Sequence, residues 1–441
     1  MTILSISNFS CLKEAEFEVT PVVAIIGPQG SGKSVTTKLN YFFADILDLH
    51  IKAAERGDSF EEFKRTIGKN FRSWFPPSAW GKERFNISYA SGDFYVRILR
   101  RTKNNRPTEE LAISFSDWFE DFYRKSLSAF NNIKRRSLDQ DLFDQAARGS
   151  TDPFDDIWRL RDTLRARISK ELRNEFVNSQ TFIPAGRAFF TSIGKMVAGF
   201  DNFSNLDPIT IRFAKLFSNL REHNASFGGN MFNRRMGDEF RARNMDFTDR
   251  LFGGEIVYEP EAEYVKTRDG RKVPFSSLSS GQQELLPMWT LIRYFAEIEE
   301  IRKGNKSPQR EILYIEEPEA HLFPTAQSAF LGYIFDSLRF TENTRSLILT
   351  THSPYIMGRL NVFLKAGSLS RRKKRNTDIN EVVPRDRWIL PNQFSAYAIQ
   401  DGFVTDIVGD DGIIDSSYLD SISDDIVSDF DKLLDIEMKI S

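Results

Sequence analysis

The sequence has little cysteine, little histidine and no long apolar segment. Its 441 residues include one cysteine, Cys11, and four histidines. One cysteine excludes an intramolecular disulfide framework and is typical of a reducing compartment. The histidines and the cysteine do not have the spacing of zinc ligands. No apolar run approaches the roughly 20 residues that a membrane helix requires, and the N-terminus lacks the basic start and apolar core of a signal peptide. We therefore expect a cytoplasmic protein without a membrane segment.

Charge of neither sign dominates, because the net charge is −2. The distribution is uneven: residues 51–250 contain 35 Lys and Arg residues against 27 Asp and Glu residues. From Asp401 onward, twelve acidic residues stand against two lysines. Such asymmetry is typical of a nucleic-acid face beside an acidic tail that binds a partner. A solvated basic surface with an acidic terminus explains it equally well, so both interpretations stay open.

The apolar periodicity predicts an α/β fold whose sheet elements lie at both ends of the sequence. Strands are expected at 2–26, 85–101, 111–115, 254–274, 312–315 and 346–350. Helices are expected at 34–54, at 116–176 with a break at 149–153, and at 207–251, 284–302 and 324–338. Alternation of strand and helix toward the end of this series indicates a parallel sheet with right-handed crossovers. The alternating pattern at 85–101 predicts an antiparallel hairpin instead.

Eight consecutive residues after the apolar run 22–26 match the phosphate-loop pattern in full. They are Gly27, Pro28, Gln29, Gly30, Ser31, Gly32, Lys33 and Ser34. Glycines permit the backbone angles that turn N–H groups toward phosphate oxygens, and the following helix presents its positive N-terminus to the same anion. In such a loop the lysine reaches the β- and γ-phosphates and the last serine ligates Mg²⁺. A chance glycine-rich turn is the alternative. The required context, a buried strand before the loop and a helix after it, is present, so we expect ATP and Mg²⁺ to bind.

A second motif ends the predicted strand 312–315 in two carboxylates, Glu316 and Glu317. A carboxylate at the end of a strand beside the phosphate loop can hold Mg²⁺ through water, and its neighbour can polarise the attacking water. We assign Glu316 to the metal and Glu317 to the base. Alone, two glutamates after a strand would more often be solvated surface. Together with a complete phosphate loop, the functional interpretation is favoured.

A third motif, Leu278–Gln283, opens a predicted helix. Serine hydroxyls and free backbone N–H groups at a helix start form an anion site. The candidate residues are Ser279, Ser280, Gly281 and Gln282. The alternative is a plain N-cap, because Ser followed by Glu or Gln is also a capping pattern. One phosphate does not need two loops of the same fold, so we expect this second loop to grip the γ-phosphate that a neighbouring molecule holds.

A fourth motif, Thr350–Pro354, follows the apolar strand 346–350 and contains His352. A histidine at a strand end can contact the γ-phosphate and sense its loss. In isolation an ordinary loop histidine is the better interpretation. Behind the other three motifs, in this order, the functional role is favoured.

The four motifs together resemble the ABC-type ATPases, and more narrowly the branch of RecF, the SMC proteins and the overcoming-lysogenization-defect (OLD) ATPases. The opening Ile6–Phe9, the segment Phe182–Arg187 and the run Glu316–Pro324 also resemble that branch. The resemblance covers mainly residues 1–50, 180–190 and 270–360. It implies an ATPase with an ABC head fold, in which two heads clamp two ATP molecules.

Further roles follow from the resemblance alone. It implies that Ser280 and Gly281 act across the interface on the partner's nucleotide. It implies that Gln180 is a lid glutamine that contacts Mg²⁺, and that Arg187 either reaches a phosphate or pairs with a carboxylate. The long spacing from Lys33 to Ser280 argues against a transporter ATPase.

OLD nucleases carry a second, metal-dependent nuclease domain, which we do not expect in this sequence. The turn Gly409–Gly412 is read as an acidic loop, so any nuclease is expected on another polypeptide. The basic run Arg371–Arg375 neutralises phosphates of DNA or RNA without reading sequence, or is a solvated loop. An acidic amphipathic helix is predicted between Asp415 and Glu437. It caps its own fold or docks a partner, and core packing is somewhat favoured.

We therefore predict a homodimeric ATPase of a bacterial antiviral defence module that gates a separately encoded effector, such as a nuclease or toxin. The alternatives are a RecF-like DNA-repair ATPase and a scaffold that keeps ATP as a structural ligand. The expected segments are an N-terminal ATPase lobe (1–115), a helical insertion (116–252), a C-terminal ATPase lobe (253–378) and an acidic C-terminal segment (379–441).

Overall fold

The computed structural model describes most of the chain. The described residues are 2–143, 153–191, 207–226, 237–259, 262–301, 310–341, 344–371, 376–415 and 427–433. Within these ranges, no helix is long and apolar enough to cross a membrane.

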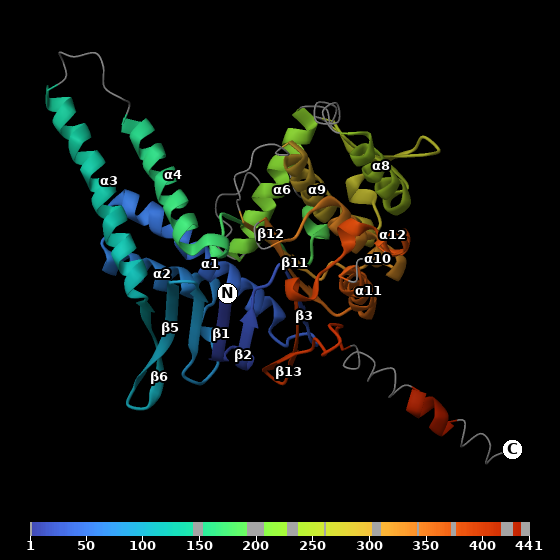
Figure 1. The fold of residues 1–441 in the computed structure, drawn as a ribbon, viewed down its shortest axis with the longest axis horizontal. Coiled ribbons are helices and arrows are strands. Elements are labelled where there is room, and N and C mark those ends of the chain that lie inside the picture. Colours follow the sequence, from blue (N-terminus) through green and yellow to red (C-terminus); the bar gives the residue numbers. More distant parts are fainter. Residues whose placement is uncertain are drawn as a thin grey trace.

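One eleven-stranded sheet organises the fold (Figure 1). In sheet order its strands are β6 (Arg106–Phe115), β5 (Phe94–Lys103), β4 (Asn86–Ser91), β1 (Thr2–Phe9), β2 (Leu12–Glu18), β14 (Phe403–Asp406), β13 (Phe394–Gln400), β3 (Val22–Ile26), β12 (Arg345–Thr351), β11 (Glu311–Glu316) and β7 (Ser179–Ile183). Strands β13, β3, β12, β11 and β7 are mutually parallel. The pairs from β6 to β2 are antiparallel. The prediction of an α/β fold with a parallel core and an antiparallel lobe is confirmed.

Two hydrophobic clusters, one on each face, bury the parallel strands. In β3, Val22, Ala24 and Ile26 enter one cluster, whereas Val23 and Ile25 enter the other. Successive side chains of a strand point to opposite faces, so a strand covered on both sides must be apolar throughout. This is why residues 22–26 form an unbroken apolar run. By contrast, β2 is covered on one face, and its exposed positions carry Lys13, Glu14 and Glu16.

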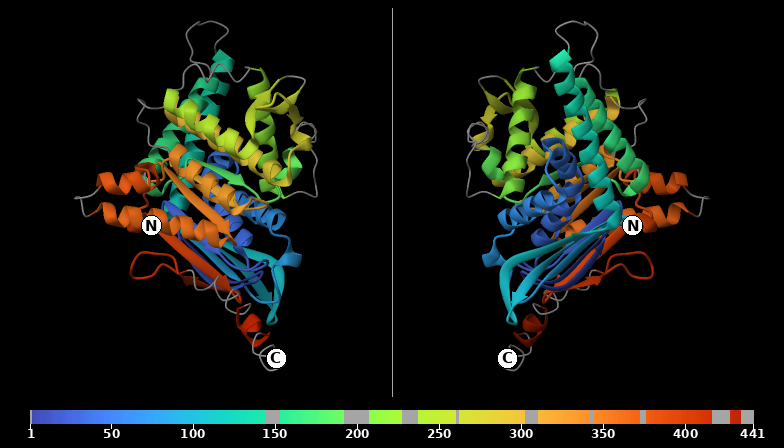
Figure 2. Two further views of the ribbon diagram at one scale, coloured as in Figure 1. Left: turned by 90° about the vertical axis from the view of Figure 1, so that its right-hand side faces the viewer. Right: turned by 90° about the vertical axis from the view of Figure 1, so that its left-hand side faces the viewer.

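Helices cover both faces of the sheet (Figures 1 and 2). They are α1 (Lys33–Arg56), α2 (Phe60–Trp74), α3 (Asp117–Phe143), α4 (Pro153–Leu172), α6 (Pro208–Ser226), α8 (Asp238–Phe252), α9 (Ser280–Ile301), α10 (Pro324–Ser337), α11 (Pro354–Ser370) and α12 (Asn376–Val382). Helices α3 and α4 project from the sheet as a pair. A separate antiparallel sheet contains β8 (Gly254–Tyr258), β9 (Glu263–Thr267) and β10 (Lys272–Pro274).

Strands β13 and β14 were not predicted; they lie in the predicted acidic segment and join the sheet between β3 and β2. A signal was present. Asp401 and Gly402, between the two strands, have φ of 52° and 86°, and a two-residue loop with positive φ at both positions is the common hairpin turn. For the helix predicted between Asp415 and Glu437, packing against the core was favoured. Residues 427–433 are helical, but Val427, Phe430 and Leu433 are exposed, so these side chains do not pack in the core.

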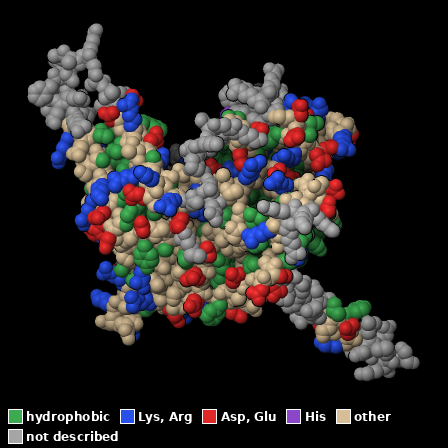
Figure 3. All heavy atoms as spheres, in the orientation of Figure 1, with side chains coloured by type: hydrophobic (Ala, Val, Ile, Leu, Met, Phe, Trp, Pro, Cys, Tyr) green, Lys and Arg blue, Asp and Glu red, His purple; other side chains and the backbone are tan. Residues whose placement is uncertain are grey.

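Lys and Arg side chains gather over the β5–β6 hairpin on the face seen in Figure 3, where Arg101, Lys103 and Arg106 are exposed. Of the basic run 371–375, only Arg371 lies within the described residues, and it donates to Asn392. The remainder of that run, and the break expected at 149–153 except its last residue, lie outside them. A nucleic-acid role for the basic surface or for the basic run 371–375 therefore stays a prediction.

Candidate functional site

The phosphate-loop residues connect β3 to α1. Gly30 and Gly32 have φ of 76° and 110°, a region that costs other residues strain but not glycine. A Cβ on Gly32 would also lie 2.8 Å from Cδ2 of Leu12 and 3.0 Å from Sγ of Cys11. Two of the loop glycines are therefore required by conformation, as the sequence pattern predicts.

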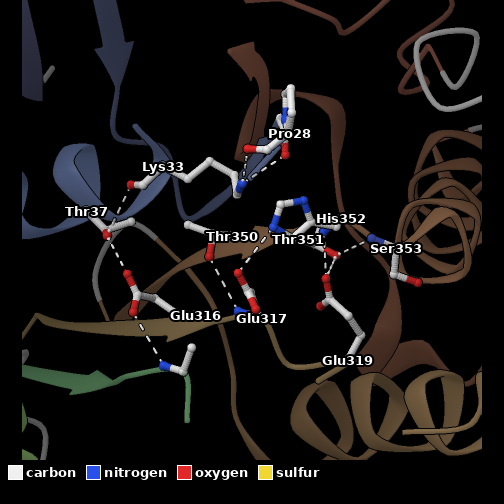
Figure 4. A network of polar contacts seen from close by, with 12 residues as sticks. Pro28, Lys33, Thr37, Glu316, Glu317, Glu319, Thr350, Thr351, His352 and Ser353 are labelled. Atoms are coloured by element: carbon white, nitrogen blue, oxygen red, sulfur yellow. Dashed lines mark hydrogen bonds and ion pairs between the residues drawn. The ribbon is translucent and has the colours of Figure 1, made fainter. Parts of the chain in front are cut away.

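Lys33 turns back onto its own loop (Figure 4). Its Nζ donates to the carbonyl oxygens of Gly27, at 2.8 Å, and Pro28, at 2.9 Å. Burial lowers the pKa of Lys33, and the carboxylates of Glu317, Glu319 and Glu316 oppose that shift. The lysine is thus held in a partly desolvated site opposite three acidic groups.

Glu316 ends β11 and is almost fully buried. Its Oε1 accepts from Thr37 Oγ1 of α1 at 3.4 Å, and its Oε2 accepts from the backbone N–H of Ala185 at 3.4 Å. Strands β3, β12 and β11 are parallel and in register, so their carboxyl ends meet at one edge of the sheet, where open α/β sheets bind ligands. The carboxylate therefore faces the start of the helix that follows the phosphate loop.

Glu317 and His352 are in contact, at 3.2 Å between Oε1 and Nε2. The backbone N–H of Glu317 donates to the carbonyl oxygen of Thr350 at 2.9 Å, which fixes the turn after β11 to the end of β12. Glu317 has φ of 44°, an uncommon value for this residue type. The hydrogen bond from His352 lowers the pKa of Glu317, and Lys33 and Arg187 add to that effect against the opposing influence of burial. The side chain is therefore a carboxylate at neutral pH.

Glu319 is a further member of this cluster that the sequence did not single out. Its Oε1 accepts from Oγ1 of Thr351 at 2.8 Å and from the backbone N–H of His352 at 2.6 Å. Its Oε2 is buried and has no hydrogen-bond partner in the structure. The glutamate thus holds the loop that carries His352. The sequence signal was its place two residues after Glu317 in the run Glu316–Pro324.

The third motif, Leu278–Gln283, which we call the signature, lies at the start of α9. Ser279 caps α9: its Oγ accepts from the N–H of Gln282, and its own N–H donates to Oε1 of Gln282, both at 3.3 Å. The capping interpretation is therefore correct. Ser279 and Ser280 are nevertheless exposed, and among the described residues no hydrogen bond joins either serine to the phosphate loop. The motif is open to a ligand from outside the chain.

Two residues assigned from the resemblance are placed by the structure. Gln180 pairs in register with Ile312, four positions before Glu316, and its amide donates to the carbonyl oxygen of Tyr41 at 3.1 Å. A strand rises about 3.3 Å per residue, so Gln180 lies at the opposite end of the strand from the site, and the expected contact with Mg²⁺ is wrong. Arg187 is fully buried and pairs with the Glu284 carboxylate, at 3.3 Å between Nε and Oε2. Of the two roles expected for Arg187, the structure has the pairing with a carboxylate.

The arrangement fits a nucleotide with Mg²⁺. Ser31 Oγ, in the loop, is buried without a hydrogen-bond partner, which a phosphate oxygen would supply. Among the described residues, no three His, Cys, Asp or Glu side chains converge on a metal position. Mg²⁺ needs no such cage, because it binds through one or two protein ligands together with water and phosphate oxygens. Ser34 and Glu316 are suitable ligands of that kind.

A sequence profile of one protein family matches residues 22–358, which contain all four motifs. The family is described as "AAA domain, putative AbiEii toxin, Type IV TA system". The chain belongs to this family. As an AAA domain of this family it carries the ATPase-type fold that the motifs predict, whereas its place in the OLD-like branch stays a prediction. No curated protein sequence matches the chain significantly.

Solved structures similar to this AAA-family chain include ATPase heads. One is an SMC head bound to the C-winged helix domain of ScpA, with 12% identity, a TM-score of 0.37 and coverage of 92% of this chain and 96% of that chain. Another is the SMC head domain from Thermotoga maritima, with 14% identity, a TM-score of 0.33 and coverage of 92% and 97%. A third is an ATP-binding cassette of an ABC transporter in its ADP conformation, with 10% identity, a TM-score of 0.29 and coverage of 92% and 90%. Identities and TM-scores this low assign neither partner nor activity.

Proposed function

We propose that this chain hydrolyses ATP in a composite site formed by two copies of itself. The observation that carries the proposal is the cluster of Lys33, Glu316, Glu317 and His352 at one edge of the sheet. These residues come from three separate regions of the sequence, and each has the chemistry that phosphoryl transfer requires.

Each side chain then has a definite task. Lys33 leaves the carbonyl oxygens of its loop and donates to the phosphates. Glu317 accepts a proton from the attacking water, and His352, which contacts its carboxylate, orients that carboxylate and contacts the γ-phosphate. Ser34 and Glu316 hold Mg²⁺, which when bound neutralises charge on the phosphates.

The second copy supplies the signature. Ser279 and Ser280 are exposed at the start of α9, where the helix dipole and free N–H groups attract an anion. In a two-fold symmetric dimer each phosphate loop faces the partner subunit's signature, because an isologous interface pairs the same two surfaces twice. Two ATP molecules are then enclosed between the heads.

We further propose that the dimer gates a separately encoded effector, a nuclease or toxin, in antiviral defence. The family description, which names a toxin of a type IV toxin–antitoxin system, supports a setting of this kind. ATP-dependent closure and release on hydrolysis would shift the effector between two states. Expression of the chain alone and with the product of a neighbouring gene tests this step. Growth arrest by the chain alone would make it the toxin itself, and hydrolysis stimulated by DNA would indicate repair.

The variant Glu317→Gln tests the proposed enzyme directly. It removes the base but keeps the shape of the side chain, so we expect it to bind ATP, to accumulate as a dimer and to lose turnover. Light scattering after size-exclusion chromatography reports the dimer, and phosphate release reports turnover. Wild-type turnover no faster than that of Glu317→Gln would support a scaffold that keeps ATP as a structural ligand.

A further inference from the structure

A buried arginine joins the catalytic edge of the sheet to the signature helix. Arg187 is completely buried. Its Nη1 donates to the carbonyl oxygens of Glu316, at 2.6 Å, and Pro184, at 2.8 Å, and its Nη2 donates to that of Glu317, at 2.9 Å. The guanidinium thus holds the backbone of both residues of the carboxylate pair. Lysine could not reproduce this, because only arginine presents a planar fork of donors.

The same segment is attached to α9 through Glu284, which is also buried. The two Glu284 carboxylate oxygens accept from the backbone N–H groups of Arg187, at 3.0 Å, and Ala188, at 3.1 Å. Thr191 Oγ1 adds a hydrogen bond to the carbonyl oxygen of Gln283 at 2.8 Å. The first turns of α9, which begin at the signature serines, are therefore fixed to the residues that follow β7.

A second contact joins the same two regions. Gly281, in the signature, lies so close to the turn after Glu317 that a Cβ on it would be 2.6 Å from the carbonyl oxygen of His321. Displacement of the Glu316–His321 turn cannot occur without a response of the signature, because close-packed contacts transmit strain. The charged link through Arg187 and the steric contact at Gly281 act on the same helix end.

From these contacts we propose that Arg187 and Glu284 are positioning residues that couple the two ATP sites of the dimer. This inference rests on the proposed function, in which the signature of one copy acts on the nucleotide held by the other. Engagement of ATP by Glu316 and Glu317 then changes the pose of α9 through Arg187. That change alters the contact of Ser280 with the ATP that the other copy holds. The two sites therefore bind and hydrolyse ATP cooperatively.

A purely structural role is the competing explanation, and the chain offers a matched control. Arg345 joins the same two elements at their other ends: it pairs with Glu311, at the start of β11, at 2.7 Å and with Glu299, near the end of α9, at 2.9 Å. It is similarly buried. The substitution Arg345→Lys should therefore weaken the packing of α9 on the sheet. Arg345 pairs with neither the carboxylate pair nor the signature, so both should keep their positions.

The test compares wild type, Arg187→Lys, Glu284→Gln and Arg345→Lys in three measurements. These are the affinity of the monomer for a fluorescent ATP analogue at low protein concentration, the Hill coefficient of hydrolysis against ATP, and ATP-dependent dimerisation in a Glu317→Gln background. For Arg187→Lys and Glu284→Gln we expect monomer affinity within about threefold of wild type, a Hill coefficient that falls to about 1, and dimerisation weaker by about 5- to 150-fold, the usual range of coupling between sites. Arg345→Lys should leave the Hill coefficient unchanged.

Two outcomes overturn the inference. A wild-type Hill coefficient in both Arg187→Lys and Glu284→Gln means that the pair does not couple the sites. Equal losses in Arg345→Lys mean that the effect is general destabilisation. If Arg187→Lys does not fold, Glu284→Gln alone decides, because it keeps the size and one acceptor oxygen of the side chain. If wild type neither hydrolyses ATP nor dimerises with it, the proposed function itself fails, which is distinguishable from a failure of the coupling alone.

Discussion

The contact between Glu317 and His352 predicts how hydrolysis depends on the base and on pH. Replacement of Glu317 by Gln leaves an oxygen that can accept from His352, so the fold should be retained. It removes the proton acceptor, and general base catalysis contributes about 10²- to 10⁴-fold. We therefore expect kcat to fall by that factor, which corresponds to about 3–5 kcal/mol of transition-state stabilisation, with ATP affinity little changed. Glu311→Gln, on the same strand but at its other end, is the matched control and should retain its kcat.

The pH profile gives an independent readout of the same pair. In wild type the hydrogen bond from His352 is the largest cause that holds the pKa of Glu317 below its ordinary value of 4.5. The base is therefore ionised throughout the neutral range, and the acid limb of kcat lies below pH 4.5. In His352→Ala that cause is absent while partial burial still raises the pKa, so the acid limb should move toward neutral pH. A profile that extends from below pH 4.5 to pH 8 checks this. A kcat of Glu317→Gln within tenfold of wild type, or an unmoved acid limb in His352→Ala, would refute the assignment.

Three more predictions follow from single contacts. Cys11 is exposed and adjacent to Gly32, so ATP should slow its reaction with a thiol reagent; an unchanged rate would contradict nucleotide binding at this loop. Gly281→Ala places a methyl group against the carbonyl oxygen of His321, so hydrolysis should fall while monomer ATP affinity is kept; equal loss of both would point to misfolding instead. Burial lowers the pKa of His50 to about 4 from 6.5, so its contribution to stability is complete above pH 6.5 and is lost as the pH falls toward 4. Wild type should lose about 2 kcal/mol more than His50→Leu between pH 7 and pH 5 in urea titrations, and equal losses would exclude this origin.

Local sequence determines one part of the candidate site. A strand, a glycine turn and a helix start are consecutive in the chain, so the conformation of Gly30, Gly32 and Lys33 follows from neighbours in sequence. The carboxylates after β11 and the histidine after β12 could be placed beside the loop because parallel strands end at the same edge of a sheet. That step needed only the expectation that these strands run parallel in one sheet.

The remaining features depend on register and on long-range contacts. Gln180 was placed at the metal because it precedes Phe182–Arg187, but pairing with Ile312 puts it at the far end of β7. The link between Arg187 and Glu284 joins residues 97 positions apart, and no local pattern specifies it. Strands β13 and β14 were missed because the whole of 379–441 was assigned as an acidic segment, and the apolar run of β13 within it is short.

The central claim is that each ATP site contains residues of two copies, and complementation between two inactive variants tests it most directly. Lys33→Ala removes the phosphate-binding lysine, and Ser280→Arg blocks the signature. In a mixture, the heterodimer has one site with an intact Lys33 from one copy and an intact Ser280 from the other. The account predicts that each variant alone is inactive and that an equal mixture recovers up to about a quarter of wild-type hydrolysis, because half of the dimers are mixed and each has one complete site. A mixture that is no more active than the separate variants would contradict it.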